Sequence, residues 1–162
     1  MKKSITSKNA EVILYRPGGN DTALVPGIPS SLNKRREINE AIFKLYPAVE
    51  QVGFLNKDKK KAQLVMAGGE FCANATRSAA YEILNGYPGD ILIKVSGVKK
   101  KLKAGIKPNG EAYAQMPIFA NPNKIINDEA NPDNFIVEME GIIHYVDFSS
   151  SIQGLTSEQI KN

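Results

Sequence analysis

The sequence of 162 residues lacks the features that mark secreted and membrane proteins. Its only cysteine is Cys72, which excludes an internal disulfide and fits a reducing compartment. No apolar run approaches the length of a membrane span, and the charged N-terminus lacks the apolar segment of a signal peptide. Internal repeats and low-complexity linkers are also missing. We therefore expect one cytoplasmic globular domain without a membrane partner.

Basic residues exceed acidic ones by 21 to 17, which gives a net charge of +4. Much of the excess lies in three clusters, at residues 34–36, 57–61 and 99–103. The last two have few aromatic residues between them, whereas a nucleic-acid surface combines basic side chains with stacking aromatics. We interpret these lysines as solvated strand ends and as protection of an edge strand against aggregation. The sequence therefore predicts no nucleic-acid partner.

Two helices are predicted from the spacing of apolar and small residues. The first begins after Ser30 or Ser31 and ends before Pro47. Its apolar face carries Ile38, Ile42, Leu45 and Tyr46. The second helix, over residues 73–84, is rich in alanine and serine, so we expect other backbone to enclose it closely.

The remaining pattern predicts many antiparallel strands. They cover residues 11–16, 22–25, 51–55, 63–66, 91–96, 102–106, 112–116, 135–138 and 142–148. Residues 121–134 are polar and rich in turn formers, so a loop is expected there. Many strands with a small-residue helix in their midst predict an α+β domain whose sheet curls around that helix.

Cys72 lies in a glycine-rich turn between a predicted strand and the alanine-rich helix. A thiol at this position is close to unpaired backbone N–H groups and to the positive end of the helix dipole. That setting favours the thiolate, which is the reactive form of cysteine. The same N–H groups can hold an anion such as a carboxylate. The turn therefore offers a base and an anion site together.

Three short motifs follow one another in the chain: PGGND at 17–21, EQVGF at 50–54 and EFCANAT at 70–76. They resemble the N-terminal half of the diaminopimelate epimerase-like family of cofactor-independent amino-acid racemases and epimerases. The resemblance covers most of residues 10–148 and is greatest to the histidine racemases of bacterial metallophore synthesis. It implies a curved mixed or antiparallel, barrel-like β-sheet wrapped around a central α-helix. Residues 1–162 would form this single domain of a two-domain fold, without its C-terminal partner.

The resemblance also implies a chemistry that needs neither a metal nor a cofactor. In this family a thiolate removes the α-proton of the amino acid, and a thiol on the opposite face returns one. Cys72 would be one of these two acid/bases. The backbone N–H groups of Ala73 and Asn74 would hold the substrate carboxylate, and Asn20 and Gln51 would line the pocket.

The same residues also have structural interpretations. Asn20 fits an ordinary hairpin turn, and Gln51 can satisfy neighbouring backbone groups. Asn74 can cap the helix while it orients a carboxylate. His144, the only histidine, lies in an apolar predicted strand, and we interpret it as structural. Glu70 would raise the pKa of a nearby thiol, so we assign it no role.

The sequence departs from the family pattern in three ways. Ala73 replaces the glycine that follows the cysteine. Met66 and Ile142 occupy positions where the diaminopimelate epimerase has asparagines that hold the distal carboxylate of its substrate. Burying that charge against apolar side chains is costly, so we expect an amino acid with a less charged side chain. The third departure is the missing second cysteine of the two-thiol mechanism.

Two explanations of the missing thiol stay open. The second acid/base can come from an absent C-terminal half, which agrees with the capping box TSEQ at 156–159 close to the end of the sequence. Alternatively, two copies of the chain form a symmetric homodimer in which the Cys72 residues face each other. Two further functions are also retained: a non-catalytic amino-acid-binding module, and a phenazine-biosynthesis-type isomerase that uses no thiols. A redox thiol module is disfavoured, because the chain has no resolving cysteine.

Overall fold

The computed structural model describes residues 2–7, 10–117, 125–139 and 142–147. The chain divides into two compact units, Met1–Pro117 and Ile118–Asn162. The described part of the first contains β1 (Lys2–Ser7), β2 (Ala10–Tyr15), η1 (Pro17–Gly19), β3 (Asp21–Pro26), α1 (Leu32–Leu45), β4 (Val49–Asn56), η2 (Lys59–Lys61), β5 (Gln63–Met66), α2 (Ala73–Ile83), β6 (Gly89–Val95), β7 (Leu102–Ile106) and β8 (Ala112–Ala114). The second contains β9 (Ile125–Asn127), β10 (Asn134–Met139) and β11 (Ile142–Asp147). The assignment of residues 1–162 to a single domain stays a prediction.

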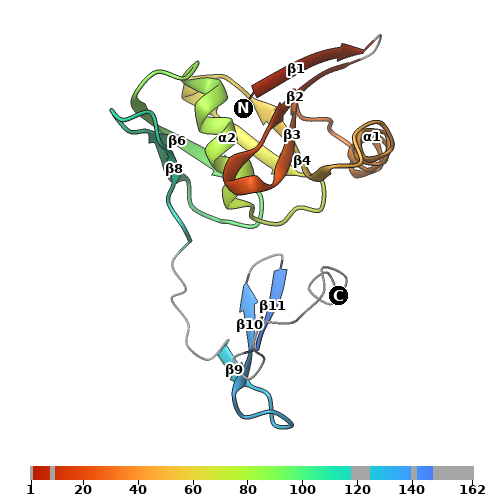
Figure 1. The fold of residues 1–162 in the computed structure, drawn as a ribbon, viewed down its shortest axis with the longest axis vertical. Coiled ribbons are helices and arrows are strands. Elements are labelled where there is room, and N and C mark those ends of the chain that lie inside the picture. The colour runs from red at the N-terminus through yellow and green to blue at the C-terminus, as the bar shows by residue number, and fades with distance from the viewer. Residues whose placement is uncertain (1, 8–9, 118–124, 140–141, 148–162) are drawn as a thin grey trace. The chain divides into compact units, whose positions relative to one another are not determined.

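The first unit is built on one mixed sheet with the strand order β1-β2-β3-β4-β5-β6-β7-β8. The pairs β3–β4 and β5–β6 are parallel, and the other neighbours are antiparallel. The sheet curves around α2, as Figure 1 shows. The predicted fold class, an α+β domain with a curved sheet around a central helix, is therefore confirmed.

Each α-helix connects one of the two parallel pairs. Such crossovers are right-handed in nearly all proteins. Because β4 and β5 are antiparallel, the two crossovers start in opposite directions, and the rule places α1 and α2 on opposite faces of the sheet. The buried clusters confirm this arrangement, since Leu24 and Leu55 pack with α2 whereas Val25 and Phe54 pack with α1.

The small residues of α2 allow the sheet to enclose it. Seven of its eleven residues are buried, and the side chains of Ala75, Ala79 and Ala80 are fully inaccessible. Side chains of this size let neighbouring backbone approach closely, whereas larger ones would force the packed elements apart. The expectation that other elements surround this helix is confirmed, and their enclosure fixes where its N-terminus lies.

α1 is anchored by far fewer contacts. Ser31 is its N-cap, and the Ser31 hydroxyl accepts a hydrogen bond from the Lys34 N–H at 3.0 Å. Only Ile42 is buried within the helix, although Ile38 and Tyr46 pack against the same cluster. Leu45 is 65% exposed, so its predicted place on the apolar face is wrong.

A polar network joins the C-terminal half of α2 to the sheet. Glu82 is buried, and its carboxylate accepts a hydrogen bond from the Tyr15 hydroxyl. The same carboxylate forms an ion pair with Lys57, with 2.9 Å between Nζ and Oε1. Burial, with the adjacent carboxylate, raises the pKa of Tyr15 far above its ordinary value. Lys57 is therefore a structural partner of the core, which the interpretation of its cluster as solvated strand ends did not predict.

Two strands were not predicted. β1 is a polar segment without the apolar alternation of a half-buried strand. β9 lies inside residues 121–134, which were expected to form a loop, and it pairs with β10 in an antiparallel sheet of order β11-β10-β9. Three residues are too short a run for patterning to reveal. The predicted capping box at 156–159 lies outside the described residues, and in the part of the chain that is described no helix has the length and apolarity to cross a membrane.

Candidate functional site

Cys72 is the N-cap residue of α2, at the end of the turn that follows β5. Its backbone is extended, with φ −135° and ψ 115°, and its Sγ accepts a hydrogen bond from the Ala75 N–H at 3.4 Å. Gly69 allows the turn because its φ of +88° lies in the region that favours glycine. The predicted location of the thiol at a helix start is therefore correct.

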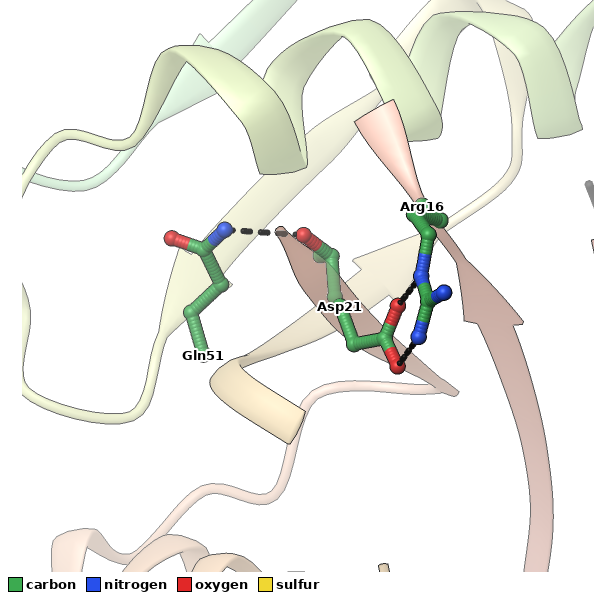
Figure 2. A network of polar contacts seen from close by, with 4 residues as sticks. Arg16, Asp21 and Gln51 are labelled. Atoms are coloured by element: carbon green, nitrogen blue, oxygen red, sulfur yellow. Dashed lines mark hydrogen bonds and ion pairs between the residues drawn. The ribbon is translucent and has the colours of Figure 1, made fainter. Parts of the chain in front are cut away.

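Gln51 on β4 is the side-chain partner of Cys72. The thiol donates a hydrogen bond to Gln51 Oε1 at a distance of 2.8 Å between Sγ and Oε1. The other end of the amide, Nε2, donates to Thr22 Oγ1 at 2.9 Å. Figure 2 shows the amide of Gln51 turned toward β3, the strand that begins with Asp21, and it shows the ion pair between Asp21 and Arg16, which precedes η1. The structure thus brings together two predicted site residues, Cys72 and Gln51, and it adds Thr22, which was not predicted.

Thr22 is fully buried on β3, directly opposite Gln51 in the parallel register. Its hydroxyl is one of the few polar groups in the core of the first unit. A single threonine among apolar strand residues gives a weak signal in one sequence. The stronger signal is its position directly after the PGGND motif, on a strand that must pair with the one carrying Gln51.

The surroundings of Cys72 favour its protonated form. Burial is the main cause that raises the pKa of the thiol, and the negative charge of Glu70 adds to the effect. The N–H groups of Ala75 and Asn74, together with the charge of Arg77, act in the opposite direction. The expectation that this turn favours the thiolate is therefore wrong in its net direction. The helix start does lower the pKa as expected, but desolvation outweighs it.

The first turn of α2 carries backbone N–H groups that no helical carbonyl can accept. The helical ladder begins with the Thr76 N–H, which donates to the Cys72 carbonyl at 3.0 Å. Ala73 and Asn74 precede it, directly beside the thiol. Asn74 does not cap the helix, because its Oδ1 accepts instead from the guanidinium of Arg77. The arrangement can hold a carboxylate next to Sγ, as helix N-termini do in other proteins.

Ser96, directly after β6, fixes the turn before Cys72. Its hydroxyl donates to the Glu70 carbonyl at 2.7 Å and accepts from the Met66 N–H at 2.9 Å. The Glu70 carboxylate folds back over Gly68, where a Cβ atom would collide with it. Gln51 and Glu70 also line a cavity of about 270 Å³ that reaches toward α1. A negative charge therefore lies at the edge of the site.

The other predicted residues are placed less centrally. Asn20 is exposed at the end of η1, a turn that approaches α2 where Gly18 comes close to the Arg77 guanidinium. Met66 is fully buried on β5. His144 is exposed on β11 in the second unit, and its interpretation as a structural residue stays a prediction; the side chain of Ile142 lies outside the described residues. Among the residues described, no group of three or more His, Cys, Asp or Glu is arranged to hold a metal ion.

Known proteins resemble this chain over almost its whole length. The family model of the histidine racemase CntK N-terminal domain matches residues 10–162. A histidine racemase of Staphylococcus aureus is 28% identical over 153 residues, which cover 89% of this chain and 55% of that protein. A histidine racemase of Fusobacterium nucleatum subsp. nucleatum is 31% identical over 157 residues, covering 84% and 54% respectively. The chain thus spans about half the length of the curated relatives it matches.

Proposed function

Because the chain belongs to the family of the histidine racemase CntK N-terminal domain, we propose that it forms one half of a cofactor-independent amino-acid racemase. Cys72 is one acid/base at the α-carbon of the substrate. The observation that carries this proposal is the position of the thiol as the N-cap of α2, where the backbone N–H groups of Ala73 and Asn74 in the first turn lie beside it. A carboxylate held by these groups brings its α-carbon next to Sγ.

The reaction needs little from the protein beyond positioning and charge stabilisation. The α-C–H bond breaks, its proton goes to a thiolate, and its electron pair is delocalised into the bound carboxylate. A thiol on the opposite face then gives its proton to the α-carbon, which inverts the configuration. The N–H groups at the start of α2 stabilise the negative charge that develops on the carboxylate. Cys72, whose thiol donates a hydrogen bond to Gln51, is in the protonated form that returns a proton in the second step.

The second acid/base comes from outside this chain. One thiol cannot reach both faces of an α-carbon, and this chain spans only about half the length of the relatives it matches. A C-terminal half that carries the second thiol agrees with that length. A symmetric pair of chains, with one Cys72 from each, is the alternative. Mass measurement of the native species separates these two arrangements.

Histidine is the proposed substrate. The matching relatives are histidine racemases. Glu70, at the edge of the cavity that Gln51 also lines, would attract a weakly basic side chain and repel an acidic one.

The test is exchange of the α-proton for deuterium in D₂O, measured by NMR with L-histidine, other amino acids and diaminopimelate. It is run on this chain and on the polypeptide that includes a second half, with Cys72→Ala as the control. We expect exchange of histidine that Cys72→Ala abolishes. Diaminopimelate as the best substrate contradicts the proposed specificity. Unchanged exchange in Cys72→Ala contradicts the thiol mechanism and favours the isomerase that uses no thiols.

A non-catalytic amino-acid-binding module is the second candidate. The raised pKa of Cys72 supports it, because a thiol that stays protonated is a poor base. Histidine that binds to the complete polypeptide without exchanging its α-proton would identify this function.

A further inference from the structure

A chain of two hydrogen bonds leads from the thiol into the core of the sheet. Cys72 Sγ donates to Gln51 Oε1 at 2.8 Å, and Gln51 Nε2 donates to Thr22 Oγ1 at 2.9 Å. The three residues come from α2, β4 and β3, so each bond joins a different pair of elements. Gln51 is half-buried beside a cavity, whereas Thr22 is completely buried. The amide is thus held between a titratable group and a fixed hydroxyl.

This arrangement suits only one charge state of the cysteine. A carbonyl oxygen can accept a hydrogen bond from a thiol, but it would direct its lone pairs at a thiolate. An amide nitrogen can donate to a thiolate, and such charge-assisted bonds are stronger than neutral ones. A half-turn of the Gln51 amide exchanges these two ends. After the turn its oxygen faces Thr22, whose hydroxyl can donate as well as accept.

We propose that Thr22 is a positioning residue that holds the Gln51 amide in hydrogen-bond contact with Cys72 both when the cysteine is a thiol and when it is a thiolate. When the thiol loses its proton, the amide turns so that its nitrogen faces the sulfur. This inference rests on the proposed function of Cys72 as an acid/base. A hydroxyl is suited to this position because it can partner either end of an amide. A valine has nearly the same shape and can partner neither end. Without the hydroxyl, the amide turns away into the neighbouring cavity.

Other charges around the site stay in place during this exchange. The charges of Glu70 and Arg77 act on the thiol in opposite directions. Asp21, next to Thr22 on β3, is paired with Arg16 (Figure 2). On the outer side, Glu50 and Arg36 line the cavity that Gln51 also lines. The variants below leave all of these groups unchanged, so any difference between them reports on the hydrogen-bond chain.

The first measurement is the rate of Cys72 alkylation by iodoacetamide as a function of pH, without substrate. We expect Gln51→Met to raise the pKa of Cys72 by about one unit, because the thiolate loses its donor. Thr22→Val should shift it in the same direction, and Thr22→Ser should keep the wild-type value. The double variant should match Gln51→Met alone, since both substitutions remove one interaction. A lowered or unchanged pKa in Gln51→Met, or additive shifts in the double variant, would overturn the proposal.

The second measurement follows the amide itself and needs no substitution in the core. In ¹⁵N spectra of the side-chain amides, the Gln51 signal should move with the pKa found by alkylation and should not titrate in Cys72→Ser. A Gln51 signal that stays constant while Cys72 ionises overturns the turning amide, even if Thr22→Val does not fold. Both measurements omit the substrate, so they separate this inference from the proposed function. Shifted pKa values without α-proton exchange would contradict only the function, and exchange without shifts would contradict only the role of Thr22.

Discussion

The helices α1 and α2 occupy equivalent places in the topology but are held in different ways. Each connects a parallel strand pair and begins at a side-chain cap. α2 buries seven residues against the curved sheet, whereas α1 buries only Ile42. α2 is held by close backbone packing of small residues, and α1 rests on the outer face through one stripe of larger ones. Depth of burial thus follows residue size as much as hydrophobicity.

The caps of the two helices differ in chemistry as well. Ser31 offers α1 a hydroxyl at 3.0 Å, a good hydrogen-bond acceptor. Cys72 offers α2 a sulfur at 3.4 Å, which is a weak one. The enclosed helix needs its cap less, since packing already holds it. It can therefore carry a reactive group where the outer helix carries a stabilising one.

The largest expected difference between the helices is their tolerance of added volume. Ala79→Leu on α2 should lower the free energy of unfolding by about 3 kcal/mol, because the enclosed site has no room for the larger side chain. Ala41→Leu on the exposed face of α1 is the matched control and should change it by less than about 0.5 kcal/mol. Urea titrations of both variants provide the measurement. Equal losses would show that α1 is enclosed as tightly as α2.

A smaller difference is expected from the caps. Ser31→Ala should cost about 1 kcal/mol of stability, the usual value for a lost N-cap hydroxyl. Cys72→Ser preserves a capping atom, so its stability should stay within about 0.5 kcal/mol of the original. Thermal unfolding gives both numbers, and α-proton exchange gives the second readout. A Cys72→Ser variant that is much less stable would assign the thiol a structural role.

The smallest expected difference is in alkaline stability. The thiol of Cys72 has a raised pKa in the folded state, so its contribution to stability is complete below the ordinary cysteine pKa. That contribution is lost as the pH rises through the folded-state pKa, because the unfolded chain releases this proton first. The stability of Cys72→Ser should therefore fall less steeply above pH 9 than that of the wild type. Tyr15 stays in both proteins as an internal reference, and identical slopes would contradict a raised thiol pKa.

Sequence patterning predicted the central elements well because their boundaries are chemically sharp. β5 and β7 have the predicted bounds, since turn residues and lysines flank their apolar runs. The enclosure of α2 was predictable from its alanines. The short β9 and the polar β1 lack a period, so they were missed. Leu45 was misplaced because periodicity shows which residues share a face but not how far the neighbouring sheet extends.

The contact between Cys72 and Gln51 was predictable from the sequence, but the pKa shift of the thiol was not. The motifs identified Cys72 and Gln51, and the helix start identified the N–H groups of Ala73 and Asn74. The direction of the thiol pKa depends on the burial that the whole fold imposes, which no local motif contains. Thr22 was missed for a related reason. Thr22 lies beside Gln51 only through the register between β3 and β4, and these two residues are 29 positions apart in the chain.

The hydrogen-bond chain from Thr22 to Cys72 also has a consequence for how the protein acquires its structure. Gln51 meets Cys72 across 21 residues and Thr22 across 29, so neither bond can form within a local segment. The thiol of a newly synthesised chain is therefore exposed to oxidants until β3, β4 and α2 have assembled. Closure of these contacts gives the half-buried thiol its hydrogen-bond partners and, by raising its pKa, makes it less reactive. The drop in reactivity of a single sulfur thus reports the moment at which the curved sheet closes around its helix.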